Sequence, residues 1–208
     1  MTSSIESFRQ ALDACSDIEA QLRDIDQAQA GLDAIKSKIS EATDEETALE
    51  LADELDKAQR LASVRTIRRG KSEQGLAAAA EAAWHLRGPA CAEANEILSG
   101  AAGSAFDDLA NALLSIIPPD ARTASPIRQA SEIFPANCVF NRQIDKATRK
   151  LFDALNHPAA VDDAAARAES CRRGLRDIDE GLAMLPEIEL DATRAERIAE
   201  AINAACNE

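Results

Sequence analysis

The chain has 208 residues, 46% of them apolar, which is enough to bury a core and excludes a chain that is disordered by composition. The net charge of −14 at pH 7 disfavours direct binding to free nucleic acid and to anionic membranes, although it suits a basic partner. With eight glycines, seven prolines and no long run of alternating apolar residues, the sequence also argues against a β protein.

An amphipathic helix is expected over residues 4–41. Apolar residues recur there at steps of three and four, which places them on one helical face: Ile5, Phe8, Leu12, Cys15, Ile18, Leu22, Ile25, Leu32 and Ile39. The extra step of three between Cys15 and Ile18 predicts local overwinding of a coiled coil. A stripe of this length indicates a helix that packs lengthwise on another helix.

A second helix is expected to start at the segment Thr43-Asp44-Glu45-Glu46, which has the form of a capping box. A short turn between two long helices predicts an antiparallel hairpin, and folding about residue 43 places Leu22 near Val64. The expected inward stripe of the second helix is Ala48, Leu51, Leu55, Ala58, Leu61, Val64 and Ile67.

The second helix is expected to end at Gly88-Pro89, because proline lacks the amide hydrogen that a helix interior uses. The alanine run before this end is expected to face the first helix, with Ala78 near Phe8 and Ala82 near Ile5. Short helices are expected next, at about 90–99, 105–117 and 126–134, with 100–104 as an ordinary linker.

Three further helices are expected toward the C-terminus. The first carries Phe140, Ile144, Ala147, Leu151 and Ala154. The second has an unbroken heptad stripe of Val161, Ala164, Ala168, Cys171, Leu175, Ile178, Leu182 and Leu185. The third follows Pro186, with Asp191 or Thr193 as its cap. The sequence thus predicts an all-α fold: a long, coiled-coil-like antiparallel helical hairpin over 1–88 and a bundle of shorter helices over 89–208.

A basic cluster in this acidic chain is the candidate interaction surface, together with the single tryptophan: Arg60, Arg65, Arg68, Arg69, Lys71 and Trp84. The hairpin places the cluster opposite Asp17, Glu19, Asp24 and Asp26, so cross-hairpin pairing or solvation competes with contact to a phosphate or an acidic partner. Without interleaved aromatic residues, a site that stacks nucleic-acid bases is not expected. Trp84 suits either a core anchor or an interface hot spot.

No group of residues indicates catalysis, and we expect neither a metal site nor a cofactor. The five cysteines lie far apart in the sequence, which is typical of reduced thiols in a cytoplasmic protein. His85 and Cys91 are separated by Gly88-Pro89, so a structural thiol and a surface histidine are expected instead of a catalytic pair; His157, the other histidine, has no motif around it. Glu81 and His85 lie four residues apart and can touch on a helix. No secretory signal or bilayer-spanning segment is visible.

The expected function is non-enzymatic. A two-helix hairpin has too little interior to bury both of its apolar stripes, so it favours a scaffold that binds a protein partner, itself or both, as a homo-oligomer. One alternative is an acidic inhibitor that occupies a basic, nucleic-acid-binding surface of another protein. The other is a catalytic or ligand-binding helical bundle whose pocket forms only in three dimensions.

Overall fold

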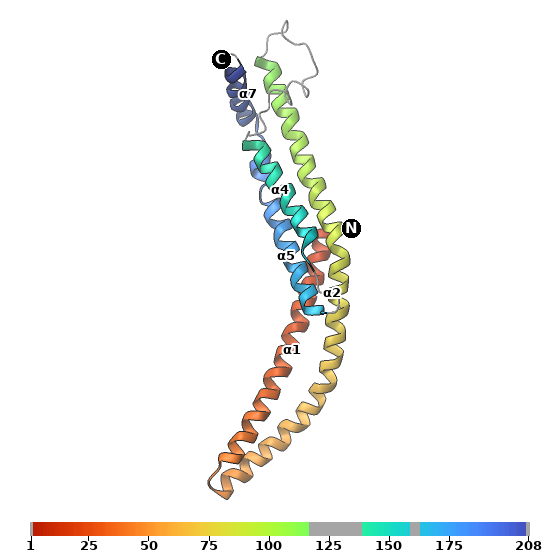
Figure 1. Cartoon of the computed structure of the whole chain (residues 1–208), viewed down its shortest axis with the longest axis vertical. Coiled ribbons are helices and arrows are strands. Elements are labelled where there is room, and N and C mark those ends of the chain that lie inside the picture. The colour runs from red at the N-terminus through yellow and green to blue at the C-terminus, as the bar shows by residue number, and fades with distance from the viewer. Residues whose placement is uncertain (1, 117–138, 159–162, 207–208) are drawn as a thin grey trace. The chain divides into compact units, whose positions relative to one another are not determined.

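A computed structural model describes residues 2–116, 139–158 and 163–206 of the chain (Figure 1). The described ranges are helical apart from short connections and contain no strand, so the all-α prediction is confirmed. In chain order the helices are α1 (Ser4–Glu41), α2 (Glu45–Ile116), α4 (Val139–Asn156), α5 (Ala164–Leu182), α6 (Leu185–Ile188) and α7 (Ala192–Cys206). The segment 126–134, expected to be helical, lies outside the described residues.

The chain forms two compact units. The first, here called the hairpin unit, comprises Ser7–His85 and Ala159–Glu169. The second, the bundle unit, comprises Met1–Glu6, Leu86–Pro158 and Ser170–Glu208. Helix α2 contributes to both, with the division between His85 and Leu86.

In the hairpin unit, α1 and α2 run antiparallel side by side (Figure 1). The apolar stripe predicted for α1 is confirmed, since each of its members is buried or half-buried. A small core forms around Cys15, Leu76, Ala80 and Ala168, so the beginning of α5 covers the pair of long helices there. An ion pair between Arg167 and Glu81 reinforces this contact.

The bundle unit is built from the second part of α2 together with α4, the later part of α5, α6 and α7. Its largest fully buried side chains include Leu109, Ile178 and Ile188. Small residues bring α5 close to α4: a Cβ atom on Gly174 would lie 3.0 Å from the Ala154 carbonyl oxygen. The heptad stripe predicted for α5 is confirmed from Ala164 to Leu182, whereas its last member, Leu185, begins the separate short helix α6. Asp191 caps α7 by accepting a 2.8 Å hydrogen bond from the Arg194 amide.

The predicted end of α2 at Gly88-Pro89 is wrong, because the helix continues through Pro89 to Ile116. The segment 100–104, expected to be a linker, is part of α2. The short helices expected at 90–99 and 105–117 also belong to α2, which is described as far as Ile116. Buried side chains on both sides of Pro89 form one continuous face: Ala80, Ala83, Ala90, Cys91, Ala94, Leu98, Ala105 and Leu109. Burial of that face outweighs the local cost of Pro89 and of the glycines at 88, 100 and 103 in the helix.

The start of α2 also differs from the prediction by one residue. Asp44, rather than Thr43, is the cap, because its carboxylate accepts a 2.7 Å hydrogen bond from the Thr47 backbone amide. This hydrogen bond is the main reason why the pKa of Asp44 lies below its ordinary value. The tight turn of the hairpin therefore sits at residues 42–44, as expected.

Candidate interaction surface on the helical hairpin

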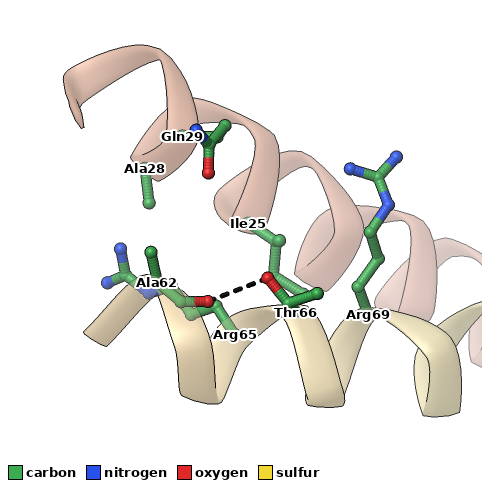
Figure 2. A pocket seen from close by; sticks show the side chains of 7 residues that line it. All are labelled: Ile25, Ala28, Gln29, Ala62, Arg65, Thr66 and Arg69. Carbon is green, nitrogen blue, oxygen red and sulfur yellow. Dashed lines mark hydrogen bonds between the residues drawn. The ribbon is translucent and has the colours of Figure 1, made fainter. Parts of the chain in front are cut away.

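The side of α2 that faces α1 follows a different line from the predicted stripe. The first half agrees, since Ala48, Leu51, Leu55 and Ala58 are half-buried. The buried line then passes to Ala62, which lines a small cavity with Ile25 of α1 (Figure 2). It continues to Leu76 and Ala80. The predicted contacts of Ala78 and Ala82 with α1 are wrong, because both residues are exposed.

This change leaves three large apolar side chains in solvent. Leu61 is 58% exposed, Val64 50% and Ile67 69%, so the prediction that they line the hairpin core is wrong. The physical reason is the helical repeat: three residues advance by less than one turn, and repeated steps of three carry the side chains around the helix. Val64 and Ile67 thus lie on the side of α2 away from the buried line.

Exposed basic side chains surround these three residues. Arg60 and Lys71 share their side of the helix by the 3.6-residue repeat, Arg68 lies at the edge of that side next to α1, and all three are exposed. We call the set of Arg60, Leu61, Val64, Ile67, Arg68 and Lys71 the outer strip. It combines an apolar centre with cationic groups that can donate hydrogen bonds to carboxylates.

The predicted cross-hairpin pairing holds for one member of the basic cluster. Arg69 Nη1 lies 2.7 Å from Asp26 Oδ1, and its Nε lies 2.9 Å from Glu73 Oε1. These contacts, the one with Glu73 first, raise the pKa of Arg69. Arg60 pairs instead with Asp56, one turn earlier on the same helix, at 2.7 Å.

The other three cations lack a carboxylate partner within 4 Å in the described part of the chain: Arg65, Arg68 and Lys71. Arg65 and Arg68 line an open groove of about 270 Å³ beside Asp24 without forming an ion pair with it. The cavity beside Ile25 holds about 40 Å³ and admits no more than a few water molecules (Figure 2). The groove and the cavity therefore offer little enclosed space for an organic ligand.

Trp84 does not belong to this surface. It lies on α2 thirteen residues beyond Lys71, which is about 20 Å along the helix axis, and it is half-buried. The structure thus brings together the five predicted cations on one stretch of α2 and separates the tryptophan from them.

The order of charges along α2 was missed in the sequence reasoning. Every charged residue from 44 to 56 is acidic, and every charged residue from 57 to 72 is basic. The acidic segment carries its own exposed apolar residue, Leu49, which is 64% exposed. A count of charge signs along the helix would have revealed this segregation without a structure.

A polar cluster in the bundle unit is the second feature of interest. His157 Nε2 lies 2.5 Å from Asp177 Oδ2, and Lys150 Nζ lies 3.2 Å from Asp177 Oδ1 and 2.6 Å from Glu180 Oε2. The carboxylates of Glu180 and Asp177 raise the pKa of Lys150. The side chain of His157 is 24% exposed, and its imidazole contacts Asp177 on α5.

The same cluster fixes the chain just after α4. The His157 carbonyl oxygen accepts hydrogen bonds from Arg87 and from the buried Ser170 hydroxyl, both at 3.2 Å. Each polar group thus holds another one in place, which is the arrangement of a structural network. Cys171, the residue after Ser170, is fully buried, so its thiol is not accessible to a substrate.

His85, the other histidine, and the buried Cys91 also have structural environments. His85 is 73% exposed and lies 2.9 Å from Glu81 one turn earlier, as the spacing predicted. Burial raises the pKa of the Cys91 thiol, which opposes formation of a nucleophilic thiolate. Within the described ranges, no three His, Cys, Asp or Glu side chains are grouped closely enough to bind a metal ion.

None of the described helices combines the length and apolar character needed to cross a membrane. No family model matches the chain, and neither a curated protein nor a solved structure shows significant similarity to it.

Proposed function

We propose that this protein is a non-enzymatic helical scaffold that acts through protein–protein contacts, and that the hairpin associates with further copies of itself. The exposed apolar centre of the outer strip carries this proposal. Single exposed apolar residues are common on protein surfaces, but Leu61, Val64 and Ile67 recur every three residues on one helix and are bordered by cations. Full burial of an aliphatic side chain contributes about 1.5–3 kcal/mol, so covering the centre of the strip stabilises an assembly by a few kcal/mol.

The architecture of the hairpin unit supports the same proposal. Near Cys15 and Leu76, the beginning of α5 covers α1 and α2. Toward the turn at 42–44, most apolar side chains between the two long helices are half-buried, although Leu32 is buried. A pair of helices without a third layer gains stability when another chain covers it.

A double substitution tests the proposal. Val64→Glu with Ile67→Glu places charges at the centre of the outer strip while leaving the inward face of α2 intact. We expect the full chain to exceed the monomer mass in light scattering at about 100 μM, and the double variant to have the monomer mass. The matched control is Phe152→Glu with Leu155→Glu, because these residues are a similarly exposed apolar pair on α4.

The helical content and the melting temperature show whether each variant is folded. If the unchanged chain is monomeric at this concentration, self-association is wrong. If both double variants reduce the mass equally, the association does not depend on the outer strip.

A further inference from the structure

One face of α2 carries a pattern that is complementary to itself. Residues 44–72 divide into an acidic half and a basic half, and the change falls between Asp56 and Lys57. On the side of the helix away from α1, each half presents an exposed apolar residue: Leu49 in the acidic half and Val64 in the basic half. A surface with this order can pair with a second, inverted copy of the same surface.

We propose, building on the self-association proposed above, that two copies of the chain pair through this face of α2. The helices run antiparallel over residues 44–69, which are symmetric about a two-fold axis between Asp56 and Lys57. The acidic half of each copy then lies along the basic half of the other copy. A two-fold axis makes both halves of the contact identical, so the complementarity is used twice.

The positions of individual residues fix the register. Leu49 and Val64 are equally distant from the axis, so Leu49 of one copy opposes Val64 of the other. Asp53 and Arg60 are likewise equidistant, so each carboxylate opposes a guanidinium. All four side chains are exposed and lie on the same side of α2. A parallel arrangement would set acidic against acidic and basic against basic segments, and it is therefore disfavoured.

The size of the contact determines its strength. Residues 44–69 span about 39 Å at 1.5 Å per residue, and a strip about 10 Å wide buries roughly 400 Å² on each copy. The total of about 800 Å² lies below the range of stable, standard-sized interfaces. We therefore expect a dimer with a micromolar dissociation constant that separates on dilution.

Two charge-reversed variants of the full chain test the pairing. The acidic variant carries Arg60→Glu, Arg68→Glu and Lys71→Glu, and the basic variant carries Glu46→Lys, Glu50→Lys and Asp53→Lys. In each variant alone, the three reversed residues carry the same sign of charge as the opposite half of the face, so its two copies repel. Mixed together, the two variants are complementary along the whole face. We expect the dissociation constant of each variant alone to rise at least tenfold, and that of the mixture to return to the unchanged chain's value or below.

Sedimentation at several concentrations measures these constants, and native mass spectrometry identifies the mixed dimer by its mass. The antiparallel pairing is overturned if the mixture associates no better than either variant alone. It is also overturned if either variant alone associates as well as the unchanged chain. In both cases the proposed scaffold role stands, provided that the Val64→Glu, Ile67→Glu variant is monomeric.

A membrane surface is the competing occupant of a helix face with apolar and basic residues. Vesicles of phosphatidylcholine with one-third phosphatidylserine, sedimented with the chain, provide the comparison. We expect the chain to remain in the supernatant. Binding to these vesicles by a chain that is monomeric without them overturns the pairing of two copies and assigns the face to lipid.

Discussion

At the scale of single residues, glycine positions report how closely helices approach. A Cβ atom on Gly174 would lie 3.0 Å from the Ala154 carbonyl oxygen, whereas one on Gly103 would meet nothing within 4 Å. We expect Gly174→Ala to lower the free energy of unfolding by about 1–3 kcal/mol, because α4 and α5 must separate. Gly103→Ala should raise it by about 1 kcal/mol through helix propensity alone. Urea unfolding measures both, and a stabilising Gly174→Ala would contradict the close packing.

Another residue-scale contact makes stability depend on pH. Glu93 accepts a 3.1 Å hydrogen bond from the Ile5 backbone amide in the first turn of α1. Hydrogen bonds from Ser3 and from that amide lower the pKa of Glu93. A carboxylate with a lowered pKa stabilises the folded state above its unfolded pKa of about 4.3, and this contribution is lost as the pH falls through the folded pKa.

The variant Glu93→Gln isolates this effect because it does not titrate. We expect its melting temperature to lie below that of the unchanged chain at pH 7, and the difference to shrink by pH 3. Glu96→Gln, at an exposed position on the same helix, is the control. A difference for Glu93→Gln that is the same at both pH values would argue against the capping role.

At the scale of elements, the stripes of α1 and α5 were predictable because each lies on one face from end to end. The inward line of α2 was not, because Leu61 is more apolar than Ala62 and satisfies the same three-four spacing. In the structure Ala62, not Leu61, lies on the inward side of α2, in line with Leu76 and Ala80 in the core. The basic cluster could be predicted from the sequence, but the exposed apolar centre beside it was assigned to the core.

The length of α2 could not be predicted from local sequence signals either. Gly88-Pro89 is a strong stop signal, yet Ala83 and Ala90 on either side of it are completely buried. Stop signals describe the backbone alone, whereas packing of a whole face stabilises the helix by more than one proline costs. The same reason explains why the glycines at 100 and 103 do not end it.

Helix α2 should therefore be locally destabilised at its proline. Pro89 cannot donate a hydrogen bond to the His85 carbonyl, and its side chain is exposed. We expect Pro89→Ala to raise the free energy of unfolding by about 1–3 kcal/mol, because it restores the hydrogen bond without changing the buried face. Chemical unfolding followed by circular dichroism measures the change. Lower stability of Pro89→Ala would mean that the proline ring makes a contact that alanine cannot replace.

At the scale of the whole molecule, net charge and local charge order oppose each other. The chain carries −14 at pH 7, so two copies repel at long range. The proposed contact, by contrast, brings opposite charges together over residues 44–69. Repulsion between distant charges is screened first, since the Debye length falls from about 30 Å at 0.01 M salt to about 8 Å at 0.15 M.

This opposition predicts that dimerisation is strongest at intermediate ionic strength. Between 0.01 and 0.15 M NaCl the dissociation constant should fall, because long-range repulsion is screened while pairs such as Asp53 and Arg60 remain in contact. Between 0.15 and 1 M it should rise again, because exposed ion pairs are then screened as well. Sedimentation of the full chain at the three salt concentrations measures this course, with the Val64→Glu, Ile67→Glu variant as a monomeric reference. Association that strengthens steadily up to 1 M would show that the apolar side chains alone hold the copies together and that the charge order does not direct them.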